Sequence, residues 1–153
     1  MDRQAQLERF RTGFKDVQDA LDGITPDELA RRPPGSDWSS REVVHHLADS
    51  ETTAYVRLRR LIAEDDPLLG DYDEEEFARR LHYDRPIEPS LEVLGAVRAA
   101  SLQLLESLTP AEWDRTGTHS VEGSYSVDDW LRTYAGHSHD HADQIRRARR
   151  GEA

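Results

Sequence analysis

The sequence predicts an all-α protein: a four-helix bundle with one long crossover connection. Apolar residues recur at the spacing of amphipathic helices in four long segments, at about 2–21, 39–63, 90–108 and 126–150. No segment predicts a convincing sheet, although the stretch around Glu122-Gly123-Ser124 is consistent with a small hairpin or an extended loop. The third connection is too long for a simple hairpin between helices, which favours a crossover.

Capping and breaking residues set the ends of the first two long helices. Gly23 ends the first, and a threonine followed by proline at 25–29 begins a short helix. The second long helix begins at Ser39 or Ser40. Ser39 with Glu42 three residues later predicts a capping box.

The second half of the chain alternates long and short helices. The acidic connection after the second long helix should hold one short helix near 74–81, and Ser90 should cap the third long helix. A single turn follows at 109–113. The fourth long helix begins at 126–128, and Gly151 ends it.

Size and charge restrict the class of protein. A chain of 153 residues corresponds to one domain, spanning 1–153, with room for a real core. The net charge of −11 argues against a nucleic-acid partner, whose binding surface would be basic. One basic cluster exists, at 146–150. Its arginines either complement the dipole of the last helix or contact nucleic acid, and we favour the dipole.

The chain has no cysteine, which excludes disulfides, thiolate metal ligands and a cysteine nucleophile. Any thiol chemistry would therefore need an external thiol. We find no apolar signal region and no run long enough to span a bilayer, so we expect a cytoplasmic protein without a membrane partner.

Three histidines on two predicted helices indicate a metal site. At about 100° per residue, His137 and His141 share the apolar face of the last helix, whereas His139 lies off it. His46 lies at the edge of the apolar face of the second long helix, and His45 points nearly the opposite way. Three inward imidazoles predict a divalent-metal site with an open position for water or substrate. Because the ligands must be neutral, we expect metal affinity to fall as the pH drops through about 6.5.

Glu51 is the candidate catalytic residue. It lies on the same apolar face as His46, where an unpaired carboxylate is costly. It would act as a general base or accept a hydrogen bond from a ligand imidazole. The alternative is an ion pair with an arginine or a place at the rim of the bundle. Gln144 is either a neighbour of the site or an ordinary polar residue at its edge.

Two motifs resemble a known family. They are Trp-Ser-Ser-Arg-Glu-Val-Val-His-His-Leu-Ala-Asp-Ser-Glu at 38–51 and His-x-x-x-His-x-x-Gln-Ile at 137–145. Together they resemble the DinB superfamily, and within it the YfiT-like branch of metal-dependent hydrolases, over nearly the whole chain. The resemblance implies a DinB-like four-helix bundle, a homodimer, and a nickel or zinc ion held by His46, His137 and His141. Some members of the family transfer low-molecular-weight thiols such as bacillithiol or mycothiol to electrophiles.

Three classes of function are consistent with these observations. The first is a metal-dependent enzyme that transfers a bacillithiol-like thiol to an electrophilic small molecule or hydrolyses a small substrate. Bound metal would convert a thiol to a thiolate, or activate water. The second class is a non-catalytic metal- or ligand-binding bundle of a stress response. The third is a structural helical dimer with incidental histidines.

Overall fold

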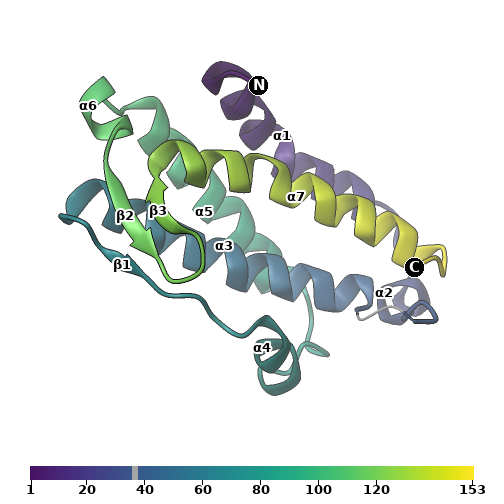
Figure 1. Cartoon of the computed structure of the whole chain (residues 1–153). Coiled ribbons are helices and arrows are strands. Elements are labelled where there is room, and N and C mark those ends of the chain that lie inside the picture. The colour runs from purple at the N-terminus through teal and green to yellow at the C-terminus, as the bar shows by residue number, and fades with distance from the viewer. Residues whose placement is uncertain (36–37) are drawn as a thin grey trace.

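Four long helices form a bundle in the computed structural model, which describes residues 1–35 and 38–153 (Figure 1). They are α1 (Arg3–Leu21), α3 (Ser40–Ala63), α5 (Glu88–Glu106) and α7 (Val127–Arg149). The connections between them hold the short helices α2 (Pro26–Ala30), α4 (Glu74–Arg80) and α6 (Pro110–Trp113). The predicted four-helix bundle is confirmed.

Helices α1 and α7 run parallel to each other. Arg3, at the start of α1, donates to Asp128 at the start of α7, and Arg149, at the end of α7, donates to the carbonyl of Ala20. Side chains at the same end of both helices therefore meet. The other long pair, α3 and α5, is also parallel, since His45 pairs with Ser90 early in both helices and Arg59 pairs with Ser101 late in both.

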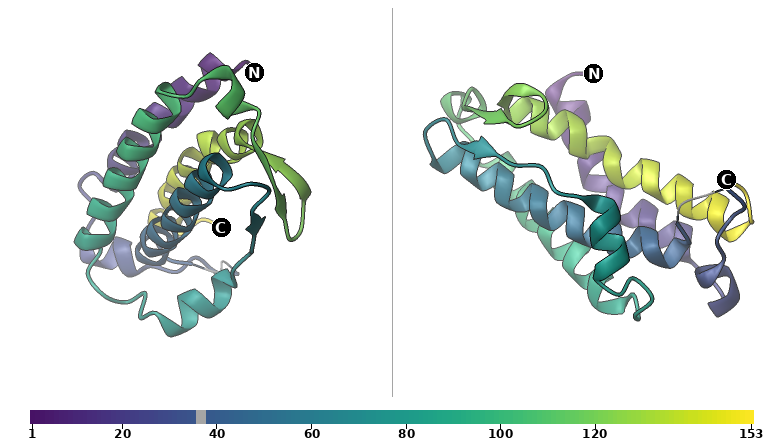
Figure 2. Two further views of the ribbon diagram at one scale, coloured as in Figure 1. Left: turned by 90° about the vertical axis from the view of Figure 1, so that its left-hand side faces the viewer. Right: turned by 60° about the horizontal axis from the view of Figure 1, so that its bottom comes forward.

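The two parallel pairs run in opposite directions. Trp130, near the start of α7, donates to the carbonyl of Ala54 in the second half of α3, and Ser40, at the start of α3, donates to the carbonyl of Ile145. The chain must therefore return along the whole bundle between α3 and α5. This return is the predicted crossover, and it runs beside α3 before reaching α4 (Figure 2). The predicted short helix near 74–81 is confirmed at 74–80.

A small sheet, which the sequence predicts only in part, ties the crossover to one end of the bundle. Strands β2 (Thr116–His119) and β3 (Gly123–Ser126) form an antiparallel hairpin, the first of the two structures expected there. Strand β1 (Leu68–Leu69), in the crossover, adds parallel to β2. A strand of two residues is too short for any periodic pattern, and its partner lies about fifty positions away. Strand β1 was therefore missed.

A buried polar layer divides the apolar core in two. One apolar cluster contains Phe10, Leu58, Leu105 and Trp130, at the end of the bundle that carries the sheet. The other contains Val17, Val44, Leu94 and Ile145. Between them along the four helices lie Gly13, Glu51, Arg98 and Ser138, all buried. This layer gives the bundle a polar centre at the level where α3 faces α7.

Two local predictions were wrong. Helix α5 begins at Glu88 rather than at Ser90, because Pro89 is tolerated in a first turn and no side chain caps Ile87. Ser90 instead lies inside the helix and pairs with His45. His45 itself is fully buried, although its position on the helix predicted that it would point away from the interior. Helix α3 packs against both α5 and α7, so its buried face is wider than a single stripe.

No helix in the described part of the chain combines the length and the apolar character that crossing a bilayer requires.

Candidate metal centre

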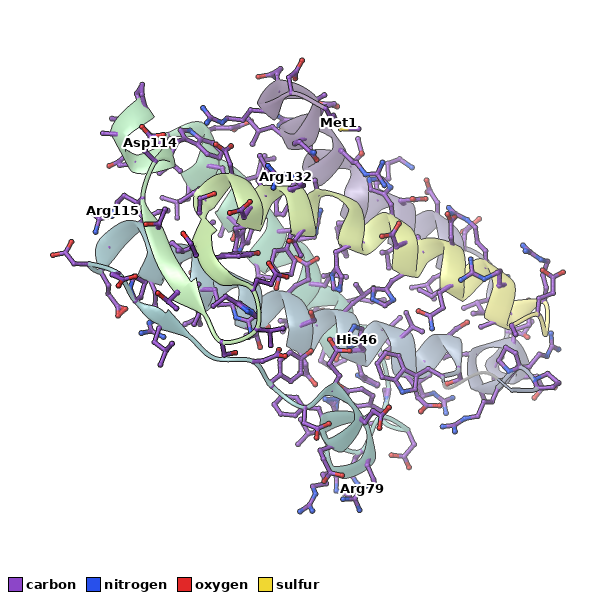
Figure 3. The ribbon with its side chains drawn as sticks, viewed as in Figure 1. Met1, His46, Arg79, Asp114, Arg115 and Arg132 are labelled. Atoms are coloured by element: carbon purple, nitrogen blue, oxygen red, sulfur yellow. The ribbon has the colours of Figure 1, made fainter. Side chains whose placement is uncertain are left out.

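The antiparallel packing of α3 and α7 brings His46 against the pair on α7. Figure 3 labels His46 on α3. One potential ligand atom from each of His46, His137 and His141 lies within 4.8 Å of the others. The ring centroid of His141 is 4.7 Å from that of His46 and 4.7 Å from that of His137. His46 and His137 are 5.8 Å apart. The three side chains that the sequence selected can therefore hold one ion.

The two cluster histidines of α7 are oriented through their Nδ1 atoms. His137 Nδ1 lies 3.1 Å from Glu51 Oε1, and His141 Nδ1 lies 2.7 Å from Gln144 Oε1. Each acceptor is an oxygen, so Nδ1 donates the hydrogen bond and Nε2 is the nitrogen left for a metal ion. Such hydrogen bonds fix the tautomer and ring direction of metal-binding imidazoles. Of the two alternatives for Gln144, the structure supports a neighbour of the site.

His46 is held by packing rather than by a hydrogen bond. The Trp38 ring lies 4.6 Å from its ring, and the side chain is 2% exposed. Within residues 1–35 and 38–153, its buried Nδ1 has no hydrogen-bond partner. An unsatisfied buried nitrogen is costly and calls for an explanation. Three imidazoles suit zinc or nickel as ligands, and a bound ion would give the unpaired nitrogen of His46 a partner.

Burial keeps two of these imidazoles neutral. Desolvation, with smaller contributions from the other two histidines, lowers the pKa of His46 to about 3. Desolvation and the proximity of His137 lower the pKa of His141 to about 4. The expectation that protons compete with metal near pH 6.5 was therefore wrong for these two residues. Their lone pairs stay available in the folded protein well below neutral pH.

Glu51 lies at the centre of the polar layer and is 3% exposed. Burial would raise its pKa, but the Arg98 guanidinium and the hydrogen bonds from His137 and Ser138 together hold the pKa below its usual value. Its Oε1 is 2.6 Å from Arg98 Nη1. The structure thus combines two of the sequence-based alternatives: Glu51 accepts from His137 and also pairs with an arginine. Its role as a general base stays a prediction.

The sequence analysis missed Arg98, although a signal for it was present. Arg98 is four residues after Leu94 and seven before Leu105, both of which are buried apolar positions of α5. A cation at this spacing falls on the inward face and needs a buried partner. Glu51, already recognised as an unpaired carboxylate on another helix, was the complementary signal.

A cavity of about 280 Å³ adjoins His137. Its walls come from α3, the crossover, the β2–β3 hairpin and α7, so residues far apart in sequence converge on it. Tyr134, a buried residue of α7, lines the cavity. Its ring lies edge-on to that of His137, at a centroid distance of 5.6 Å. Other residues around the cavity include Ser50, Arg57, Asp71, Glu74, His119 and Thr133. A small molecule in this cavity would lie beside the histidine cluster.

His139 lies outside the cluster, as expected from its helical position. Its Nδ1 is 2.7 Å from Asp16 Oδ2, and its Nε2 is 2.9 Å from the carbonyl of Arg9. It therefore joins α7 to α1 on the outside of the bundle. The basic cluster at the end of α7 also has partners within the chain: Arg146 pairs with Asp16, and Arg149 pairs with Glu28.

Comparison with known proteins agrees with this arrangement. A model of the DinB superfamily matches residues 9–145. A relative from Oceanobacillus iheyensis named "Putative metal-dependent hydrolase" is 40% identical over 108 residues, which cover 71% of this chain and 63% of the relative. A relative of the same name from Geobacillus kaustophilus is 32% identical over 85% of this chain and 74% of its own length.

A solved structure has the same fold. YfiT from Bacillus subtilis, described as a probable metal-dependent hydrolase with an unusual four-helix bundle topology, superposes with a TM-score of 0.88. The match covers 100% of this chain and 91% of YfiT at 25% sequence identity.

Proposed function

The chain belongs to the DinB superfamily, and on that premise we propose that it is a metal-dependent hydrolase of a small substrate, with His46, His137 and His141 as the metal ligands. The observation that carries the proposal is the convergence of the three ligand atoms within 4.8 Å. When bound, a divalent ion supplies Lewis acidity, which activates a nucleophile at neutral pH and polarises the bond under attack. Zinc and nickel both suit three imidazole ligands.

The protein's own residues prepare this centre in three ways. Burial keeps His46 and His141 neutral, so their lone pairs are available near pH 7. Glu51 and Gln144 accept hydrogen bonds from His137 and His141, which directs the opposite nitrogens away from those acceptors. Among residues 1–35 and 38–153 the cluster provides three protein ligands. Three ligands with an open position are typical of catalytic rather than structural sites.

The cavity beside His137 is where we place the substrate. Its volume of about 280 Å³ is close to the lower end of ordinary ligand pockets, roughly 300 Å³, and suits a small molecule. Tyr134 and Ser50 offer hydroxyl groups along its walls, and Arg57 donates to the hydroxyl of Tyr134. These groups would orient a polar substrate with its reactive bond toward the histidines.

Transfer of an external thiol is the second candidate. The chain has no cysteine, so the sulfur would have to enter as a low-molecular-weight cosubstrate such as a bacillithiol-like thiol. The same three histidines and the same cavity would serve this reaction, in which the electrophile takes the place of the hydrolysed substrate. The homodimer and the cytoplasmic location stay predictions.

A paired assay tests the proposal and separates the two reactions. Protein purified without a metal-affinity tag would be stripped with a chelator and reloaded with Zn²⁺ or Ni²⁺ alone. It would then be assayed on an ester and amide panel, and with bacillithiol, mycothiol and glutathione against one reactive electrophile. We expect metal-dependent hydrolysis that is lost in His141→Ala and kept in the matched control His139→Ala.

Other results would redirect the assignment. Turnover only with a thiol would favour the transferase. Stoichiometric metal without turnover on either panel would favour the non-catalytic metal-binding bundle. Absence of bound metal in the reloaded protein would contradict the metal centre itself.

A further inference from the structure

Arg98 of α5 connects to every other long helix of the bundle. Its side chain is 4% exposed. Nη1 lies 2.6 Å from Glu51 Oε1 of α3 and 3.4 Å from the Tyr134 carbonyl of α7. Nη2 lies 2.7 Å from the Phe10 carbonyl of α1, and the guanidinium lies 4.0 Å from the centre of the Phe10 ring. Four contacts on three helices leave this guanidinium little freedom.

The space for the guanidinium comes from a glycine in α1. A Cβ atom at Gly13 would lie 2.6 Å from Arg98 Nη2 and 3.0 Å from the Cβ of Ser138. The planar group therefore fits between α1 and α7 only because position 13 has no side chain. Glycine in a helix interior weakens the helix, so its presence here is consistent with a need for this space.

One oxygen joins Arg98 to the metal centre. Glu51 Oε1 accepts from Arg98 Nη1 at 2.6 Å and lies 3.1 Å from His137 Nδ1. The hydroxyl of Ser138 donates to the same atom at 3.3 Å. Because Arg98 is itself fixed by α1 and α7, it fixes the position of the oxygen that orients His137. The connection runs from Arg98 through Glu51 to the imidazole of a proposed metal ligand, His137.

We infer that Arg98 is a positioning residue for the metal centre. Arg98 holds Glu51 Oε1 in place, and this oxygen sets the tautomer and the direction of the His137 ring. A contribution to stability alone would not explain the pair well. Buried ion pairs can be replaced by apolar residues of similar volume without loss of stability. Hydrogen-bonded groups behind a metal ligand, by contrast, strongly affect metal affinity.

The inference rests on the proposed metal centre, so its test uses one measurement with metal and one without. The variants are Arg98→Lys, which keeps the charge but not the planar fork, and Arg98→Met, which removes both. Arg59→Met is the matched control: Arg59 also joins α3 to α5, through Ser101, but does not contact Glu51. Circular dichroism and thermal melting would show which variants fold.

The metal-free measurement is the two-bond ¹⁵N–¹H spectrum of His137 near pH 7. We expect a single Nδ1–H tautomer in the unmodified protein and in Arg59→Met, and a mixture with Nε2–H in the folded Arg98 variants. The metal measurement is the Kd for Zn²⁺ by competition with a chelator. We expect the Kd for Zn²⁺ to rise roughly tenfold in the Arg98 variants, which is the lower end of the range for residues that hydrogen-bond to metal ligands. In Arg59→Met we expect the Kd to change less than twofold.

Three results would overturn the inference. One is an Nε2–H tautomer of His137 in the unmodified protein, which would remove the link to Glu51 whether or not the variants fold. The second is a folded Arg98 variant with the parental tautomer and a Zn²⁺ affinity within twofold of the parent. The third is an equal loss of affinity in Arg59→Met, which would show a general effect of bundle packing. Failure of the unmodified protein to bind Zn²⁺ would contradict the proposed function, and the tautomer would still decide the role of Arg98.

Discussion

Glu51 and His137 are 86 positions apart in the sequence, yet Oε1 of the first lies 3.1 Å from Nδ1 of the second. The contact crosses the interface between α3 and α7 at the level of the buried polar layer. The hydrogen bond directs the other nitrogen of His137 away from the carboxylate. One carboxylate thereby connects the packing of the bundle to the geometry of the candidate metal centre.

Replacing Glu51 with glutamine tests what this carboxylate does. The amide oxygen can still accept from His137, but Arg98 then lacks its buried counter-charge, which typically costs about 3–5 kcal/mol of stability. We expect a lower melting temperature and a Kd for Zn²⁺ raised about tenfold or more. The matched control is Glu92→Gln, at an exposed position of α5. Turnover of the variant at saturating Zn²⁺ separates two roles for Glu51. Turnover equal to that of the parent indicates that Glu51 only positions His137, whereas turnover that stays low indicates that Glu51 is a general base.

Single alanine substitutions test the ligand set. His46→Ala, His137→Ala and His141→Ala should each bind far less than one equivalent of metal, because each removes one of three convergent ligand atoms. His139→Ala should keep the parental stoichiometry, since His139 bonds Asp16 outside the cluster. Elemental analysis of protein reloaded with Zn²⁺ and desalted gives the stoichiometry. Full occupancy in all three cluster variants would exclude the assignment.

The lowered histidine pKa values predict how the stability of the metal-free protein depends on pH. Between pH 6.5 and about 4, the unfolded chain protonates His46 and His141 while the folded protein keeps them neutral. The unfolded state binds more protons in this window, so the free energy of unfolding falls as the pH drops. The expected slope is about 1.4 kcal/mol per pH unit for each histidine.

Urea unfolding of chelator-treated protein at pH 7.5, 6.0 and 5.0 measures this slope. His141→Asn should show a shallower slope over the same range, because one of the buried histidines that contribute to the slope is gone. Carboxyl groups, including Glu74 whose pKa burial raises, are common to both proteins, so the difference between the two slopes reports the histidine. An equal free energy of unfolding at pH 7.5 and pH 5.0 would contradict the burial of neutral imidazoles.

Binding to duplex DNA should be undetectable at physiological salt. The chain carries a net charge of −11, and non-specific binding depends on neutralising phosphates with basic side chains. Arg146 and Arg149 already pair with Asp16 and Glu28. A gel-shift titration at two salt concentrations measures this. A salt-sensitive shift at micromolar protein would show that the cluster at 146–150 is available to phosphates.

The long elements were predictable because their signals are local. The capping box of Ser39 with Glu42 marks the start of α3, and the spacing of His137 and His141 places both on one face of α7. Both signals depend only on helical periodicity and on hydrogen bonds within one turn. The start of α5 was misplaced because Ile87 has no side-chain cap, and β1 was missed because its pairing with β2 is formed between distant segments.

By itself the sequence determined that the chain forms four amphipathic helices and that three histidines lie on or beside their inward faces. Helical periodicity needs only the identity of neighbouring residues. Tertiary structure alone decided that α3 lies antiparallel to α7, that Arg98 meets Glu51, and that Glu51 meets His137. The burial that lowers the pKa of His46 to about 3 also depends on helices packed from elsewhere in the chain. Desolvation and ion pairing arise from the whole bundle, so no stretch of sequence contains them.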